Sequence, residues 1–289
     1  MEQNEKNRVE PSTLYLVGTP IGNLADMTER AKKIISEVDF VAAEDTRNSM
    51  KLLSCFEIHK ELVSYYEHNK RQSGEKILAR LLNGESCALI TDAGMPAISD
   101  PGEDLVRLCA ENGVTVKVVP GPSACVSALA LSGLATSRFA FEGFLPAVKG
   151  ERKKRLLCLE AEERTMIFYE APHKLRATLD DMAEVFGADR KISLCRELTK
   201  LNEETIRMTI GNAINLYSTK EPRGEYVLVV DGRDIAVVNE SPLLTLSPEN
   251  HVAHYEAEGM KRMDAIKAAA KDRGMSKSDF YKLLLEEQE

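Results

Sequence analysis

The chain has 289 residues, of which 43% are hydrophobic and 29% charged, and its formal net charge is −8. A chain of this length is long for one hydrophobic core and suits two domains. The acidic balance argues against a protein that coats nucleic acid nonspecifically, although a local basic patch would still permit binding. No apolar stretch approaches the roughly 20 residues that span a bilayer, so we expect no membrane partner.

The six cysteines are scattered along the chain, and no Cys-x-x-Cys pair occurs. Most of them lie in apolar runs, which indicates the reduced, buried thiols of a cytoplasmic protein rather than a disulfide or zinc framework. No cluster of side chains has the spacing of a metal site, and we expect no metal ion. Residues 1–11 are polar and charged, which indicates a frayed tail and not a secretory signal.

In the first half of the chain, short apolar runs alternate with segments of helical spacing. The expected strands are 13–17, 40–43, 62–64, 87–90 and 114–119. The expected helices are 28–38, 74–82, 103–112 and 124–131. Strands that alternate with helices in this way predict a mainly parallel sheet with helices on its faces. We place an N-terminal α/β domain at residues 12–134.

A second alternation follows a pause at residues 132–138, which form a candidate hinge. Its expected strands are 139–142, 165–170, 192–196, 204–210 and 225–230. Its expected helices are 152–159 and 173–186. This pattern predicts a second α/β domain of similar size at residues 135–234, with a cleft between the two domains.

The composition changes after the second alternation. Residues 235–250 show no helical period and are expected to form a linker. In residues 251–289, a helix, a turn at Gly274 and a second helix with a capping-box start at Ser276 are typical of a helix-turn-helix. A helical hairpin that packs on the body or on a partner fits this pattern equally well.

Three loops rich in glycine and proline each follow a predicted strand: Gly18–Gly22, Asp92–Pro96 and Pro120–Ala124. In a parallel sheet the carboxyl ends of the strands share one edge, so the three loops would emerge together. They would form a narrow slot whose backbone groups suit an adenosine-sized ligand. The Lys-Ser/Thr of a P-loop and the Gly-x-Gly-x-x-Gly of a dinucleotide fold are both absent, which disfavours those two classes.

Seven sequence blocks, found in these loops and beyond them, resemble the signatures of the tetrapyrrole-methylase superfamily. More narrowly they resemble its ribosomal RNA branch, which methylates a cytidine ribose 2′-oxygen. The blocks are GTPIGNL from Gly18, AEDTR from Ala43, TDAGMPAISDPG from Thr91, PGPSA from Pro120, GFLP from Gly143, YEAPH from Tyr169 and RELTK from Arg196. They follow one another in order over residues 12–232. The C-terminal helices are also similar to that branch's terminal extension.

The resemblance implies two α/β domains of tetrapyrrole-methylase type with S-adenosylmethionine in the cleft between them, usually within a homodimer. Carried onto this sequence, it places the cofactor against Gly18, Pro20, Asp92, Gly94, Met95, Ile98, Ser123 and Ala124. Asp92 is the expected anchor for the ribose hydroxyls or the methionine amino group, although an aspartate that caps its own turn at the Gly94 amide also fits. We expect Asp100 to cap the helix that follows Pro101.

Methyl transfer to a ribose hydroxyl sets further requirements. The methyl donor is already a strong electrophile, so the enzyme mainly aligns the reacting atoms, and a base or cation beside the hydroxyl helps. The candidates are Glu44, Asp45, Arg47, Glu170, His173, Arg196, Glu197, Lys200, Glu203 and Glu204. We place Asp45 and Lys200 near the acceptor. For Asp45 the alternative is a structural ion pair at a helix cap.

The densest basic run has five cations within seven residues: Lys149, Arg152, Lys153, Lys154 and Arg155. Such runs are more often solvated helix faces, but in an acidic chain this one also suits phosphate contacts that position RNA. Residues 261–282 carry seven cations against three aspartates. This excess predicts a second RNA-facing patch.

The resemblance, together with the three loops and the two basic patches, implies an enzyme that methylates a cytidine 2′-hydroxyl of small-subunit (16S) ribosomal RNA, either free or in the assembled subunit. One alternative is a precorrin-type methyltransferase that acts on a small tetrapyrrole. A porphyrinoid substrate, however, requires neither the basic run nor the helical appendage. The other alternative is a non-catalytic RNA-binding factor that has kept the fold.

Overall fold

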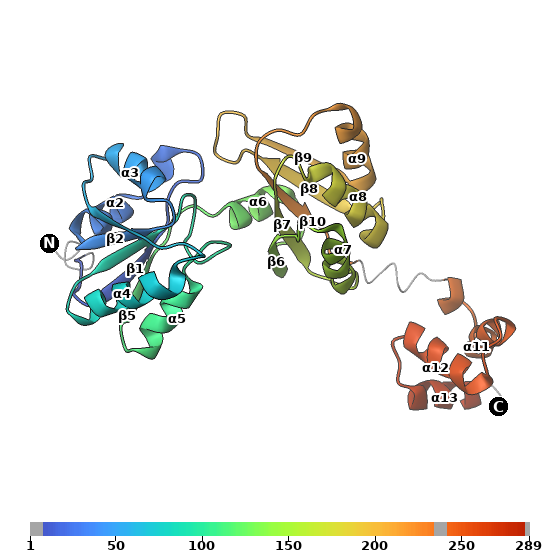
Figure 1. Cartoon of the computed structure of the whole chain (residues 1–289). Coiled ribbons are helices and arrows are strands. Elements are labelled where there is room, and N and C mark those ends of the chain that lie inside the picture. Colours follow the sequence, from blue (N-terminus) through green and yellow to red (C-terminus); the bar gives the residue numbers. More distant parts are fainter. Residues whose placement is uncertain (1–7, 234–241, 287–289) are drawn as a thin grey trace. The chain divides into compact units, whose positions relative to one another are not determined.

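The computed structural model describes residues 8–233 and 242–286. Within them the chain forms two compact units, the larger of residues 8–160 and 164–231 and the smaller of residues 161–163, 232–233 and 242–286. The larger unit contains two five-stranded sheets (Figure 1), which we call the first and second lobes. The two predicted α/β domains thus lie in one compact unit. Residues 1–7 of the predicted tail and 235–241 of the predicted linker lie outside the described residues.

The first sheet is parallel throughout, as the sequence predicts, with strand order β3-β2-β4-β1-β5. Its strands are β1 (Thr13–Val17), β2 (Phe40–Ala43), β3 (Glu61–Ser64), β4 (Cys87–Ile90) and β5 (Thr115–Val119). The last residues of β1 and β5, Val17 and Val119, are in register. The chain therefore leaves these strands at the same edge of the sheet, where the glycine- and proline-rich loops begin.

Helices cover both faces of the first sheet (Figure 1). They are η1 (Leu24–Asp26), α2 (Glu29–Glu37), α3 (Thr46–Ser54), α4 (Lys70–Leu82) and α5 (Glu103–Glu111). Because successive strand residues point to opposite faces, Tyr15 and Val17 pack with α2 and α3, whereas Leu14 packs with α4 and α5. Both cores lie behind the loop edge and hold it in place. Helix α3 is absent from the sequence prediction.

The second sheet is mixed, with strand order β6-β7-β10-β8-β9. Its strands are β6 (Phe139–Phe144), β7 (Thr165–Glu170), β8 (Lys191–Arg196), β9 (Glu204–Thr209) and β10 (Tyr226–Val230). Strands β6 and β7 are parallel, whereas β10 lies between β7 and β8 and runs antiparallel to both. The end of β7, the end of β8 and the start of β10 therefore meet at one edge.

The helices of the second lobe are α6 (Ala124–Ser132), α7 (Lys149–Cys158), α8 (Leu175–Phe186) and α9 (Ile210–Thr219). Helices α7, α8 and α9 cover the face that contains Met166 and Phe168. Helix α6 packs on the other face, where Ala128 and Leu129 join the core around Ile167. All six cysteines are free, and four of them are buried, while Cys55 and Cys158 are exposed.

The smaller unit is helical and consists of η2 (Pro242–Leu244), α11 (Pro248–Ala257), α12 (Arg262–Asp272) and α13 (Lys277–Glu286). Helix α11 begins inside the predicted linker because Ser247 caps it and proline occupies its first turn. The predicted turn at Gly274 is present, and the Asp279 amide donates to Ser276 Oγ at 3.2 Å. A core of Val252, Ile266 and Phe280 joins the three α-helices. In the part of the chain that the structure describes, no helix has the length and apolarity needed to cross a bilayer.

Candidate functional site

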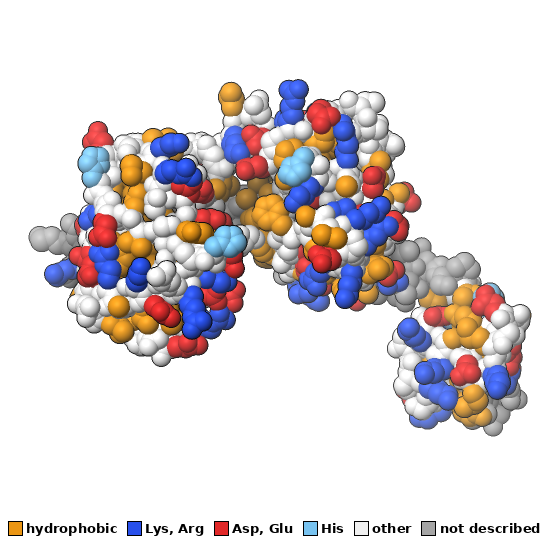
Figure 2. Space-filling view, in the orientation of Figure 1, with side chains coloured by type: hydrophobic (Ala, Val, Ile, Leu, Met, Phe, Trp, Pro, Cys, Tyr) orange, Lys and Arg blue, Asp and Glu red, His pale blue; other side chains and the backbone are white. Residues whose placement is uncertain are grey.

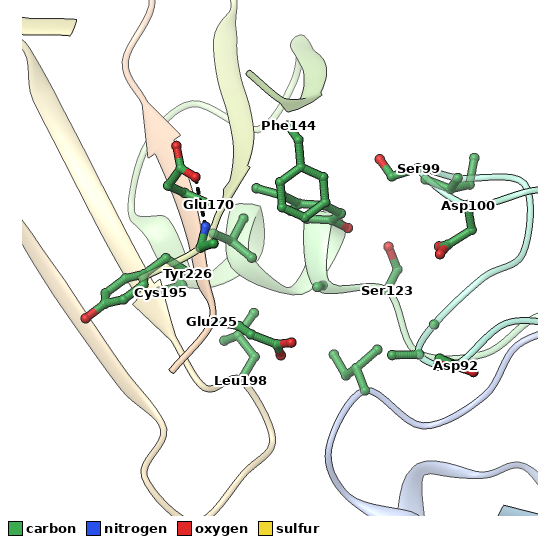
Figure 3. Close-up of a pocket in the computed structure, with 18 of the residues that line it drawn as sticks. Asp92, Ser99, Asp100, Ser123, Phe144, Glu170, Cys195, Leu198, Glu225 and Tyr226 are labelled. Carbon is green, nitrogen blue, oxygen red and sulfur yellow. Dashed lines mark hydrogen bonds between the residues drawn. The ribbon is translucent and has the colours of Figure 1, made fainter. Parts of the chain in front are cut away.

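A cavity of about 550 Å³ opens between loops of the first lobe and strand ends of the second lobe. Hydrophobic side chains gather in this hollow (Figure 2), and its volume lies in the range of small-molecule sites. One wall is the loop after β4 together with the start of α6, and the other is formed by the ends of β7 and β8 and the start of β10 (Figure 3). The predicted cofactor residues that line it are Asp92, Gly94, Met95, Ile98, Ser123 and Ala124.

Gly18 and Pro20, also predicted for the cofactor, are buried and do not line the cavity. A Cβ atom at Gly18 would lie 2.6 Å from Gly121 Cα, so the loops after β1 and β5 pack backbone against backbone. Thr19 pairs with Gly94 through two hydrogen bonds, of 2.9 Å from the Thr19 amide and 3.2 Å from the Gly94 amide. The three loops therefore form one connected support for the cavity wall, as the sequence predicts.

Both walls contain backbone in the left-handed region at residues other than glycine. In the first lobe these are Ala97 and Ser99, with φ of 66° and 60°, and in the second lobe they are Glu197 and Thr199, with φ of 52° and 64°. Each such residue costs on the order of 1–3 kcal/mol and persists only where its surroundings hold it. Such conformations cluster at functional sites, which agrees with the position of these loops at the cavity.

Carboxylates give the first-lobe wall a negative charge. The Asn48 side-chain amide donates to Asp92 Oδ2 at 2.8 Å, whereas the Gly94 amide donates to the Thr19 carbonyl, so Asp92 does not cap its own turn. Asp100 lines the cavity, and burial, with the nearby charge of Asp92, raises its pKa. The pKa of Glu44 behind them is also raised, by burial and then by the charges of Asp100 and Asp92. A wall of this kind suits a cationic ligand.

The expected cap at Asp100 is wrong. Asp100 does not cap α5, because Gly102 is the N-cap residue of that helix and Asp100 turns toward the cavity instead (Figure 3). Ser123 is the N-cap residue of α6, but its side chain makes no capping hydrogen bond. Its hydroxyl remains available at the cavity, which Ser123 lines.

The aromatic part of the site is not among the residues predicted from the sequence. Phe144, whose side chain is 59% exposed, lies at the end of β6 with its ring 5.5 Å from that of Tyr169. Both rings line the cavity together with Ile21, Leu198 and Val227. Burial raises the pKa of Tyr169 to about 12, so its hydroxyl stays protonated at neutral pH. An aromatic residue in the loop-like Gly-Phe-Leu-Pro block was the available signal for this feature.

Of the two predicted catalytic residues, only Lys200 lines the cavity. Its Nζ lies 3.0 Å from Glu197 Oε1 and 2.7 Å from Glu225 Oε2. Burial alone would lower the pKa of Lys200, but the two carboxylates outweigh it and the pKa is raised. Lys200 is thus a fixed cation at the cavity and not a base.

Asp45 has the structural role that the sequence left open as an alternative. It is the N-cap residue of α3, and its Oδ1 accepts a hydrogen bond of 2.8 Å from the Arg47 amide. The Arg47 side chain binds the same carboxylate, and these contacts lower its pKa to about 2. Asp45 does not line the cavity.

Two of the other candidate bases, Glu170 and His173, also line the cavity. Glu170 is buried, and its oxygens accept hydrogen bonds from the Ala171 amide at 2.8 Å and from the Thr178 hydroxyl at 2.5 Å. His173 is exposed and makes no hydrogen bond or ion pair with another described residue. Arg196 and Glu203 are occupied, since Arg196 pairs with Glu204 and Glu203 accepts from the Thr199 amide.

The basic run forms helix α7, and most of its cations are paired within the second lobe. Arg152 is buried, with its side chain 7% exposed and its Nε 2.7 Å from Asp181 Oδ2, so it does not face RNA and that expectation is corrected. Lys153 pairs with Glu184 and Arg155 with Glu142. Lys149 and Lys154 are exposed and pair with no described residue. The run thus leaves two free cations on one helix.

The smaller unit has a similar balance. Over residues 242–286 its seven lysines and arginines are matched by seven aspartates and glutamates. Arg262 binds Glu249 and Glu256 of α11, and Arg273 binds the Leu246 carbonyl. Lys267, Lys271 and Lys277 are exposed and unpaired among the described residues. Residues 8–233 and 242–286 contain no group of three or more His, Cys, Asp and Glu that could hold a metal ion.

Comparisons with known proteins agree with this architecture. A model of the family Tetrapyrrole (Corrin/Porphyrin) Methylases matches residues 13–214. The ribosomal RNA small subunit methyltransferase I of Halalkalibacterium halodurans is 46% identical over 287 residues, which are 99% of each chain. The protein of the same name from Bacillus subtilis is 47% identical over 270 residues, covering 93% of this chain and 92% of its own.

A solved structure shows the same fold at low sequence identity. Uroporphyrin-III C-methyltransferase from Thermus thermophilus, complexed with S-adenosylhomocysteine, is 17% identical and gives a TM-score of 0.53. The match covers 78% of this chain and 99% of that one. With the family model matching well over half of its residues, this chain belongs to the tetrapyrrole methylase family.

Proposed function

We propose that this protein transfers a methyl group from S-adenosylmethionine to the ribose 2′-hydroxyl of a cytidine in small-subunit ribosomal RNA, in the cytoplasm. The observation that carries this proposal is the identity of 46% and 47% to two proteins named ribosomal RNA small subunit methyltransferase I, over more than nine tenths of each. The likeness to a uroporphyrin-III methyltransferase is a likeness of fold at 17% identity. A tetrapyrrole substrate is therefore the weaker alternative.

The cavity fits S-adenosylmethionine in size and charge. The negative first-lobe wall, with Asp92 and Asp100, suits a ligand that carries a sulfonium and an ammonium group. Met95 and Ile98 supply apolar surface for the adenine ring beside the Gly94 backbone. When bound there, S-adenosylmethionine supplies an electrophilic methyl group. Asp92 would hold its ribose hydroxyls or its amino group, and the packed loops of Gly18 and Gly121 would keep this wall rigid.

The second-lobe wall is proposed to receive the nucleotide. The exposed ring of Phe144, supported edge-on by Tyr169, offers a stacking surface for the cytosine base. The Lys200 ammonium, held by Glu197 and Glu225, places a positive charge that would stabilise the hydroxyl oxygen as it loses its proton. This arrangement would hold the hydroxyl oxygen in line with the methyl group and the sulfur.

RNA outside the cavity would be held by cations that the fold leaves unpaired. They include Lys149 and Lys154 on α7 of the larger unit and Lys267, Lys271 and Lys277 of the smaller unit. Contacts of this kind position the RNA backbone and make binding weaker as salt rises. A helical unit with its own free cations supports an RNA-binding role for the C-terminal extension.

A homodimer is proposed from the surface of α6. The helix is apolar on nearly all sides, as in helices that are completely covered. Cys125 and Leu129 face the second sheet, but Val126 and Leu131 are exposed, as is Val118 at the end of β5. A second copy of the chain would cover this apolar surface. Light scattering measures the mass in solution of the wild-type chain and of the Val126→Asp variant. We expect a dimer for the wild-type chain and a monomer for the variant.

Transfer of a radiolabelled methyl group from S-adenosylmethionine tests the activity. The purified protein is given 30S subunits, free 16S RNA and uroporphyrinogen III in separate reactions. We expect label in RNA, at a nucleotide whose 3′ linkage resists alkali because its 2′-oxygen is methylated. Label only in the tetrapyrrole would establish the alternative substrate. RNA binding without any transfer, unchanged in Asp92→Ala, would establish a non-catalytic binding factor.

A further inference from the structure

Methylation of a hydroxyl releases a proton, and the cavity must provide a group that accepts it. We propose that the imidazole of His173 is the general base that takes the proton of the ribose 2′-hydroxyl. This inference rests on the proposed function, because it names a residue for that reaction. The other titratable groups that line the cavity lie on the donor's side, are held by partners, stay protonated or point away from the cavity.

The carboxylates of the first lobe stand on the wall assigned to the methyl donor. Asp92 is held by the Asn48 side-chain amide at 2.8 Å. Asp100 stands beside it on the same side of the cavity, across from the second-lobe strands (Figure 3). A base must face the acceptor, and the methyl group has to lie between the donor sulfur and the acceptor oxygen. These two carboxylates therefore lie on the donor's side of the methyl group and not beside the acceptor oxygen.

The carboxylates of the second lobe are occupied. Both oxygens of Glu170 accept hydrogen bonds, and the side chain points away from the cavity (Figure 3). Glu225 points toward the cavity, but its Oε2 lies 2.7 Å from the Lys200 ammonium. This contact engages the carboxylate with the ammonium group of its own wall. Lys200 itself is kept charged by its two partners.

Each of the remaining titratable side chains of this wall is unsuitable as the base, because it stays protonated or points away from the cavity. Burial raises the pKa of Tyr169 to about 12, so phenolate is scarce. Burial also raises the pKa of the Cys195 thiol, which is fully covered by its neighbours. The Tyr226 hydroxyl points away from the cavity (Figure 3) and lies 3.3 Å from the Arg223 amide, which donates to it.

His173 is left as an exposed imidazole at the cavity, with no partner among the described residues. A neutral imidazole has an open lone pair on one ring nitrogen, which can accept the proton of the hydroxyl group. The turn that carries it is held by the backbone: the Lys174 amide donates to the Ala171 carbonyl at 3.0 Å and the Leu175 amide to the Pro172 carbonyl at 3.3 Å. Glu170 fixes the start of this turn through the Ala171 amide and is a positioning residue.

The step balances with the groups named. The 2′-oxygen forms a bond to the methyl carbon while the bond between that carbon and the sulfonium sulfur breaks. The sulfur keeps the electron pair and leaves as the neutral thioether of S-adenosylhomocysteine. The hydroxyl proton passes to the unprotonated ring nitrogen of His173, which becomes imidazolium and later releases the proton to water.

The test compares His173→Ala and His173→Gln with the wild-type chain and with Lys174→Ala, an adjacent half-buried cation outside the cavity. Single-turnover methylation of 30S subunits is measured from pH 5.5 to 9. The wild-type rate should rise with pH through one ionisation and then level off. Both His173 variants should lose that ionisation and react at least 10²-fold more slowly, while binding S-adenosylhomocysteine and RNA within twofold of wild type. Lys174→Ala should keep the wild-type profile.

A His173 variant that keeps the wild-type rate, or that reacts slowly with the ionisation unchanged, would overturn the assignment. Loss of ligand binding together with activity would also overturn it, because that result indicates a structural role. These outcomes are distinct from failure of the proposed function. If the proposed function is wrong, the wild-type chain itself transfers no methyl group to RNA.

Discussion

The side-chain amide of Asn48, on α3, donates a hydrogen bond of 2.8 Å to Asp92 Oδ2 on the loop after β4. This bond joins the segments that follow two neighbouring strands, β2 and β4. It fixes the direction of the carboxylate that we assign to the methyl donor. Helix α3 therefore takes part in the site although none of its residues lines the cavity.

Asp92→Ala should weaken binding of S-adenosylhomocysteine by tenfold or more, since it removes the anchoring carboxylate. Asn48→Ala should weaken it less, by about threefold to tenfold, because a hydrogen bond to a charged group contributes about 1.5–3 kcal/mol at most and this pair is exposed. Titration calorimetry measures both. Asp180→Ala, at an exposed carboxylate on α8, is the control and should bind normally. Tight binding by Asp92→Ala would remove Asp92 from the site.

Gly18→Ala should destabilise the larger unit and weaken ligand binding, because the new Cβ would lie 2.6 Å from Gly121 Cα, where backbone cannot yield locally. The matched control is Gly150→Ala on α7, where a Cβ would meet nothing within 4 Å. That change should leave the protein as stable or slightly more stable, since alanine favours a helix by up to about 1 kcal/mol. The thermal unfolding temperatures of the two variants measure these changes in stability. Equal unfolding temperatures would contradict the tight packing of the two loops.

Arg152→Ala should lower the free energy of unfolding by about 3–5 kcal/mol, because it leaves the buried carboxylate of Asp181 without its partner. Lys154→Ala, two residues away on the same helix, should change stability by less than about 0.5 kcal/mol. It should instead weaken RNA binding and reduce the slope of log affinity against log salt by about one. Urea unfolding and salt-dependent binding measure the two effects. If the Arg152→Ala variant is as stable as the wild type and loses only RNA affinity, Arg152 belongs to the RNA-binding surface after all.

The smaller unit should lose stability as pH falls below neutral, because of His251 on α11. This ring is buried, Arg273 Nε donates to its Nδ1 at 3.2 Å, and its Nε2 lies 3.2 Å from Asp272 Oδ2. Burial is the main cause that lowers the pKa of His251 below 6.5; the charge of Arg273 also lowers it, and Asp272 opposes both. The unfolded chain therefore binds the proton first, and stability is complete above about pH 6.5 and falls below it.

Hydrogen exchange of α11 and α12 at pH 7.5 and 5.5, corrected for the intrinsic rate, measures this loss. His254→Gln is the control, since its ring is 40% exposed and the pH dependence should persist without it. Faster exchange at pH 7.5 than at 5.5 would show that the Asp272 contact outweighs burial.

The first sheet could be predicted from sequence because its strands are short, continuous apolar runs. Helix α3 could not, since only Ser49 and Leu53 of its nine residues are buried and they give little helical period. The loops at the cavity could be predicted because they are rich in glycine and proline. The role of Asp100 was predicted wrongly because the sequence around an aspartate before a helix does not show which way its side chain points. The same residues fit a carboxylate that caps the helix and one that turns into a cavity.

The aromatic wall and the role of the basic run depend on tertiary pairing. Phe144 meets Tyr169 because β6 and β7 pair with these two residues in register, 25 positions apart in the chain. Three of the five cations of α7 are neutralised by Glu142, Asp181 and Glu184, none of which is adjacent in sequence. The number of cations in a helix therefore cannot show whether they bind phosphate or pair with carboxylates of the same lobe.

Among the described strands, none of those after β5 returns to the first sheet, so the chain crosses from one sheet to the other only once, through α6 and the exposed residues 135–138 (Figure 1). A cut in those residues would leave two fragments, each with a complete sheet and its own core. The cavity would be divided between them, because each fragment keeps one wall. The two pieces would be inert apart, and methyl transfer would return only when they reassociate, which makes this enzyme a natural candidate for a split reporter.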